Sequence, residues 1–112
     1  MNFNIKEKCD SSGKKEFFYG AKINKKIQDV FLGLCYLEPK EENRKVGPGK
    51  GHEELLYLIN GKIKIKSKKT NNDLSEGEVF FIPNGQNVLI TNLIDKRSYF
   101  VIAGGHTKYH SH

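Results

Sequence analysis

Three observations on the sequence predict an all-β domain. Short runs of β-branched and aromatic residues recur along the chain, tight-turn signals separate them, and no segment has the apolar period of an amphipathic helix. The chain has 112 residues, which is enough for one domain with its own hydrophobic core. Regular short strands with tight turns are typical of a β-barrel or a two-sheet sandwich.

The expected strands can be placed from the turn signals between them. Asn60 and Gly61 form the strongest signal for a hairpin, because both central residues of a type I′ turn need positive φ. Asn71 to Asp73 and Pro83 to Gly85 indicate further turns. The strands are expected over residues 2–8, 15–23, 29–38, 54–60, 62–68, 78–83, 87–93 and 98–104.

The two faces of these strands differ along the chain. Lysines at 62, 64, 66 and 68 alternate with apolar or small residues, which predicts a solvated outer face on that strand. The runs 55–59, 79–82 and 99–103 are instead apolar on both faces, so the first 28 residues or a second subunit should cover them. Cys35 lies within an apolar run and is expected to be a buried thiol.

Composition and charge exclude several classes of protein. The net charge is +6, but there are only two arginines and no exposed aromatic residues between the lysines, so we do not expect nucleic-acid binding. The longest apolar run has five residues, and the first ten residues lack the apolar core of a signal peptide. We therefore expect a cytoplasmic protein that does not bind membranes.

A spaced set of residues near the C-terminal half carries a family resemblance. Gly77, Pro83, Gly85 and Asn92 match the second sequence motif of the cupin superfamily, in which Val88 takes the place of a histidine. The first motif is met only in part: Glu54 and Gly61 keep their spacing, while Pro48 and Lys50 stand where two histidines belong.

The resemblance implies a single-domain jelly-roll β-barrel and a homodimer. The barrel core would span residues 29–104. Residues 1–28 would form N-terminal strands that complete or cover the barrel, and residues 105–112 would form a C-terminal tail.

The resemblance also bears on metal binding. Metal sites in this family use three histidines and a glutamate, and of these ligands only Glu54 is present. Valine and proline side chains have no donor atom, so we expect no metal at the usual site and no cofactor. A divalent metal held by His52, Glu54 and His106 remains an alternative. His110 and His112 could chelate a metal, or the tail that carries them could simply be solvated.

These features favour a protein that binds a small organic ligand in the barrel cavity. The expected ligand-binding residues are Lys50, His52, Glu54, Leu56 and Val88. The Lys50 ammonium group would either pair with Glu54 in place of a metal cation or point into water.

The alternative is an enzyme with a rearranged site, and the sequence leaves open whether the protein is a catalyst. Glu54 or His52 would move protons in an isomerase or epimerase, with Lys50 holding an anionic group of the substrate. A metal-dependent enzyme of the oxygenase type is a further form of this alternative.

Overall fold

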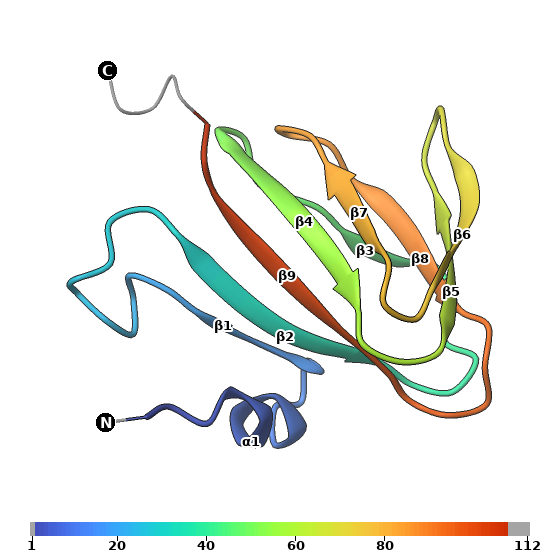
Figure 1. Cartoon of the computed structure of the whole chain (residues 1–112), viewed down its shortest axis with the longest axis horizontal. Coiled ribbons are helices and arrows are strands. Elements are labelled where there is room, and N and C mark those ends of the chain that lie inside the picture. Colours follow the sequence, from blue (N-terminus) through green and yellow to red (C-terminus); the bar gives the residue numbers. More distant parts are fainter. Residues whose placement is uncertain (1, 108–112) are drawn as a thin grey trace.

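The computed structural model describes residues 2–107 of the chain, as one short helix and nine strands (Figure 1). The elements in order are α1 (Ile5–Asp10), β1 (Glu16–Tyr19), β2 (Phe31–Leu37), β3 (Arg44–Val46), β4 (His52–Leu58), β5 (Lys62–Lys66), β6 (Asn71–Ser75), β7 (Val79–Ile82), β8 (Val88–Asn92) and β9 (Ser98–His106). None of the helices in this described part of the chain is long and apolar enough to cross a membrane.

The strands form two antiparallel sheets that face each other (Figure 1). One has five strands in the order β1-β2-β9-β4-β7, and the other has four in the order β3-β8-β5-β6. Strands far apart in sequence are neighbours, with β9 lying between β2 and β4. The all-β jelly-roll prediction is confirmed, as two facing open sheets.

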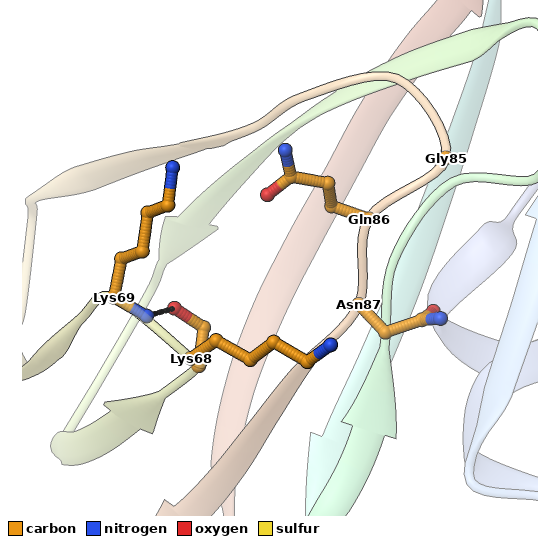
Figure 2. Close-up of a pocket in the computed structure, with 6 residues that line it drawn as sticks. Lys68, Lys69, Gly85, Gln86 and Asn87 are labelled. Carbon is orange, nitrogen blue, oxygen red and sulfur yellow. Dashed lines mark hydrogen bonds between the residues drawn. The ribbon is translucent and has the colours of Figure 1, made fainter.

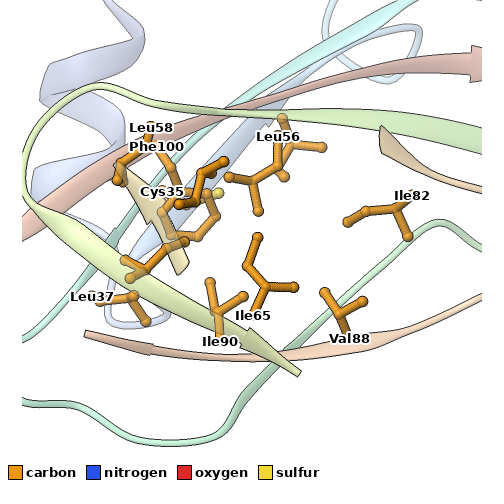
Figure 3. Close-up of a cluster of buried hydrophobic side chains, with 12 residues drawn as sticks. Cys35, Leu37, Leu56, Leu58, Ile65, Ile82, Val88, Ile90 and Phe100 are labelled. Carbon is orange, nitrogen blue, oxygen red and sulfur yellow. The ribbon is translucent and has the colours of Figure 1, made fainter. Parts of the chain in front are cut away.

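The hydrophobic core fills the space between the sheets, as Figure 3 shows. On β5 every second side chain is buried, as the period of two predicted, and β4 shows the same alternation of burial although its residues 55–58 are all apolar. Each fully buried aliphatic side chain contributes roughly 1.5–3 kcal/mol to stability. The core consists of Cys35, Leu37, Leu56, Leu58, Ile63, Ile65, Leu74, Ile82, Val88, Ile90, Phe100 and Ile102.

The prediction of a strand over residues 2–8 is wrong, because residues 5–10 form helix α1. Asn4 caps this helix, and its side chain accepts a hydrogen bond from the backbone N–H of Glu7 at 3.0 Å. An Asn followed by Glu three residues later is a signal for a helix start, but six residues are too few for an apolar period to be visible. Cys9 on α1 is fully buried and packs on the outer face of the five-stranded sheet, against Leu34 and Tyr36.

The predicted hairpin at Asn60 and Gly61 is also wrong. β4 pairs with β7 and β9, whereas β5 pairs with β6 and β8, so the connection crosses from one sheet to the other. Gly61 has a φ of 91°, as the turn signal required, but the Asn60 side chain bonds to the backbone of Arg97 and Tyr99. β4 and β5 cannot pair with each other, because both edges of each strand are occupied by other strands. The positive φ of Gly61 instead lets the chain turn from one sheet into the other.

Two strands were not predicted. β3 has only three residues, and β6 begins at Asn71, inside the run of polar residues that we interpreted as a turn. β6 lies at the edge of its sheet, where three of its five side chains are exposed, and this explains its polar sequence.

The residues behind the cupin resemblance have clear structural roles. Gly77 and Gly85 adopt positive φ of 86° and 71°, which glycine allows without strain. Asn92 is buried, and its side chain donates hydrogen bonds to the carbonyls of Glu38 and Lys96 and accepts one from the Ser98 hydroxyl. Asn92 therefore fixes the segment that connects β8 to β9. Cys35 is buried with a free thiol, as expected.

Candidate functional site

A cavity of about 300 Å³ lies between the two sheets. Its volume is at the low end of the range for small-molecule sites. The polar groups in its wall include two carboxyl groups, from Glu16 on β1 and Glu54 on β4, and the side-chain amide of Asn87. The remaining lining residues are Phe18, Cys35, Lys45, Val46, Gly47 and Ile102.

Glu54 is the most unusual residue of this cavity. It lies on the inward face of β4 and is only 8% exposed. Burial disfavours the charged form and, together with repulsion from Glu16, raises the pKa of Glu54 to about 7. Among residues 2–107, none forms a hydrogen bond or ion pair with its carboxyl group. The Glu54 carboxyl is thus poised to change protonation near neutral pH.

Glu16 has a different environment, because an arginine holds it. Nη2 of Arg44 lies 2.7 Å from Oε1 of Glu16, and Nη1 of Arg44 donates to the Tyr36 carbonyl at 2.6 Å. The Arg44 side chain is largely buried, so this pair is fixed in position more firmly than a surface ion pair. The cavity therefore holds one paired and one unpaired carboxyl group.

The structure separates some of the predicted ligand-binding residues from the cavity. Lys50 is exposed, and within the described chain no ion pair joins it to Glu54. A nearby ammonium group would lower the pKa of Glu54, whereas the pKa is raised. Of the two alternatives for Lys50, the solvent-facing one agrees with this geometry. Leu56 and Val88 are buried in the core cluster and do not line the cavity.

His52 and His106 form a second cluster of polar side chains, where β4 begins and β9 ends. The two residues are directly opposite in the β4–β9 register, and their ring centroids are 4.4 Å apart. Asp29 accepts a hydrogen bond from the backbone N–H of His106 at 2.6 Å and also contacts the Nδ1 atom of its ring. These contacts lower the pKa of Asp29. Phe31 lies beside His52, at 6.3 Å between ring centroids.

The residues at the usual family metal position do not fit a divalent ion. Glu54 has suitable donor atoms, but Val88 and Pro48 have none, and Lys50 is exposed and carries an ammonium group, which is a poor ligand. In the region from residue 2 to 107, no group of three or more His, Cys, Asp or Glu side chains is arranged to hold a metal ion. His110 and His112 lie outside the described residues. The expected lack of a cofactor remains a prediction.

Sequence reasoning missed several residues that shape the cavity. Glu16 and Phe18 come from β1, which precedes the segment that resembles cupins, and Asn87 comes from the connection before β8. In a strand over residues 16–19, Glu16 and Phe18 lie on the same face, because side chains alternate between the two faces. Nothing in the sequence showed that this face points into the cavity.

The comparisons with known proteins bear on the fold. No family model matches the sequence, and no curated protein matches it. Among solved structures, the cupin domain of Schizosaccharomyces pombe Cnp3 is similar over 74% of this chain and 60% of that one, with 17% identity and a TM-score of 0.64. This chain thus spans less than two thirds of that protein.

Two bacterial structures cover more of the chain. An uncharacterised Klebsiella pneumoniae protein with a double-stranded β-helix domain matches over 96% of this chain and 90% of its own, at 15% identity and a TM-score of 0.69. A predicted oxalate decarboxylase from Thermotoga maritima matches over 82% and 81%, at 14% identity and a TM-score of 0.66. At these identities the likeness concerns the fold, and the chain has the double-stranded β-helix fold of the cupin superfamily.

Proposed function

We propose that this protein binds a small organic ligand in the cavity beside Glu54. The observation that carries the proposal is a buried carboxyl group that faces a cavity and has no partner among the described residues. Its oxygens reach the cavity, where a ligand that bonds to them would take the place of solvent. Apolar and polar groups contribute about equally to the wall of this cavity, and a few convergent polar groups are what orient a ligand in small-molecule sites.

The charges of the cavity favour a ligand that has hydroxyl or amine groups. Glu16 and Glu54 both present oxygen acceptors, and Asn87 offers an acceptor and two donors. Because its pKa is about 7, the Glu54 carboxyl exists in both forms at neutral pH and can either accept or donate a hydrogen bond. An anionic group would meet repulsion from the two carboxyl groups, which outnumber the one lysine in the wall, Lys45. A neutral polyol or an amine therefore fits better than an acid.

The test is a ligand titration followed by NMR, with neutral polyols and amines compared with acids of the same size. Binding should shift the signals of Phe18, Glu54 and Asn87. Glu54→Gln should weaken binding by roughly tenfold, since one hydrogen bond to a charged group is lost. Glu53→Gln is the matched control, because Glu53 is the exposed neighbour on the same strand. Equal weakening in both variants would contradict the proposal.

The pKa of Glu54 also favours a second candidate function. A carboxyl group with a pKa of about 7 suits general acid–base catalysis, as in an isomerase or epimerase. The His52 side chain, our other candidate for this role, does not line the cavity. An enzyme of this class would exchange a substrate C–H proton with deuterated water, and Glu54→Gln would abolish the exchange. If the polyols, amines and acids bind but none of them exchanges a proton, the enzyme function is excluded and only the binding function remains.

A further inference from the structure

A second cleft, of about 450 Å³, lies on the four-stranded side of the molecule. It is formed by the turn after β5 and by the connection between β7 and β8, and Figure 2 shows the two segments facing each other. Its lining differs from that of the first cavity, because no carboxyl group contributes to it. The lining residues are Ser67, Lys68, Lys69, Gly85, Gln86 and Asn87.

The sheet register explains why these two segments meet. β5 and β8 are antiparallel neighbours, with Lys66 opposite Leu89. The residues that follow Lys66 and the residues that precede Leu89 therefore leave the sheet at the same end. This places the two lysines of the turn opposite the two amide side chains. In Figure 2 the Lys68 side chain runs toward Asn87, and the Gln86 side chain points toward Lys69.

The backbone of each wall of the cleft is held by a local contact. The Ser67 hydroxyl oxygen accepts hydrogen bonds from the backbone N–H groups of Lys69 and Thr70, at 3.3 and 3.1 Å. On the other side, a Cβ atom on Gly47 would lie 2.2 Å from the carbonyl oxygen of Gln86, so only glycine allows this close packing. The backbone around the cleft is therefore set before any ligand arrives.

The charge of the cleft is uncompensated. In the described part of the chain, no ion pair joins Lys68 or Lys69 to a carboxylate, and the nearby Asp73 contacts Lys62 instead, at 3.9 Å. On β5, Lys64 and Lys66 both project from the exposed face of the four-stranded sheet. Two adjacent ammonium groups in a concave site attract an anion, and the amide groups of Gln86 and Asn87 can donate to its oxygens.

We propose that this cleft binds the phosphate group of a small molecule. Lysine binds phosphate as a point charge, whereas planar carboxylates are better matched by the fork of an arginine, and the cleft has no arginine. Two ammonium groups also balance the double negative charge of a phosphate monoester. The volume leaves room for part of the molecule that carries the phosphate.

This site is distinct from the cavity of the proposed function. Asn87 lines both, but Glu54 lines only the first and the two lysines line only the second. The two proposals can therefore fail separately.

The test is an NMR titration of the full chain with inorganic phosphate, at neutral pH and low constant ionic strength, with acetate as the carboxylate comparison. Phosphate should shift the backbone amides of Ser67–Lys69 and Gly85–Asn87, and acetate should bind more weakly. The double variant Lys68→Gln/Lys69→Gln should weaken phosphate binding by roughly tenfold or more, since two unit charges are removed.

The matched control is Lys25→Gln/Lys26→Gln, which removes the same charge from another pair of adjacent exposed lysines. This pair lies in the connection between β1 and β2, away from the cleft (Figure 1). Phosphate affinity should be unchanged in this control. Equal weakening in both double variants, or shifts spread over all lysines, would overturn the proposal in favour of non-specific attraction.

A nucleic acid is the competing ligand for a lysine-rich surface, and a short single-stranded oligonucleotide distinguishes it. Oligonucleotide shifts that extend along Lys62–Lys66, together with no localised response to phosphate, would also overturn the proposal. Should the double variant fold poorly, Lys69→Gln alone must still weaken phosphate binding more than Lys26→Gln does.

Discussion

β4 and β5 follow each other along the chain and both expose charge, Glu53 on β4 and the lysines on β5, yet only β4 also places a charged group between the sheets. On β5 the lysines face water and Ile63 and Ile65 face the core. On β4 the outward residues Leu55 and Tyr57 are apolar and 48% and 44% exposed, while a carboxyl group, Glu54, faces inward. The same alternation therefore gives a solvated outer face on β5, and on β4 a largely apolar outer face with one carboxyl group among the buried side chains.

The difference teaches which parts of the molecule have a role beyond folding. A charged outer face and an apolar inner face need no further explanation. A partly uncovered apolar face indicates contact with another protein molecule. A buried carboxyl group that has no hydrogen-bond partner in the described chain indicates a ligand. Helix α1 covers the part of the five-stranded sheet formed by β1, β2 and the start of β9, where the Tyr99 hydroxyl donates to Asp10 (Figure 1). The outward residues left exposed include Leu32, Leu55, Tyr57, Val79 and Phe81.

The largest expected effect concerns the two sides of β4 itself. Leu56→Ala should lower the free energy of unfolding by about 2–5 kcal/mol, because Leu56 is fully buried and its loss leaves a cavity. Leu55→Ala should cost less than about 1 kcal/mol in the monomer. Chemical denaturation of both variants measures the difference. A Leu55 effect that grows with protein concentration would show that a second copy covers this face.

The next effect is the pH dependence that Glu54 imposes on stability. Its pKa rises from 4.5 in the unfolded chain to about 7 in the folded protein, so the folded state binds the proton more tightly. Its contribution to stability is full below about pH 4.5 and is lost as the pH rises through about 7, by at most about 3 kcal/mol.

The measurement is the free energy of unfolding across this pH window for the natural chain and for Glu54→Gln. The difference between the two should depend on pH, because other carboxyl groups titrate equally in both. Glu53→Gln should retain the slope of the natural chain. Parallel curves for the natural chain and Glu54→Gln would contradict a raised pKa.

A third prediction concerns the apolar face, which we expect a second copy of the chain to cover. Two copies with a net charge of +6 each repel one another. They can approach most closely through this face, because no lysine or arginine projects outward from β4, β7 or β9 there. Leu55→Lys/Phe81→Lys should convert a dimer into a monomer, as measured by sedimentation velocity.

The control for this prediction adds the same charge to the other sheet. Leu89→Lys/Thr91→Lys lies on the lysine side, where Leu89 is opposite Lys66 and Thr91 is opposite Lys64, and it should leave the dimer intact. A natural chain that remains monomeric at all accessible concentrations would exclude the dimer.

The smallest effect is expected on the outer face of β5. Lys64→Thr/Lys66→Thr should change the free energy of unfolding by less than about 1 kcal/mol, because both side chains are exposed and threonine suits a strand. Solubility at low ionic strength should fall, because repulsion between molecules is reduced. Denaturation and solubility assays check the two expectations, and a large loss of stability would mean that this face is not simply solvated.

The sequence predicted the features that depend on local chemistry. The alternation on β5 and the turns at Gly77 and Gly85 follow from neighbouring residues alone. Pairing between distant strands does not, which is why Asn60 and Gly61 suggested a hairpin where the chain changes sheets. Helix α1 was missed because it is short and is stabilised by a cap and by packing.

The candidate site was predicted in part for the same reason. Glu54 faces the space between the two sheets, and its spacing to Gly61 and its alternation along the strand are local properties that the sequence shows. Glu16 and Asn87 reach the cavity only through long-range pairing of β1 and through the connection before β8. For Lys50 the sequence left two alternatives open, and in the structure this residue is exposed in the turn that precedes β4.

The position of β9 also governs how the protein is made. β9 separates β2 from β4, and residues 98–106 leave the ribosome after every other strand described here. During synthesis, β2 and β4 therefore have no partner on that side, and their apolar surfaces stay exposed until β9 arrives. Exposed apolar surface and unpaired strand edges favour aggregation, so we expect the nascent chain to be at greatest risk before β9 is complete. Completion of the five-stranded sheet is thus a late event, which truncation before β9 would prevent.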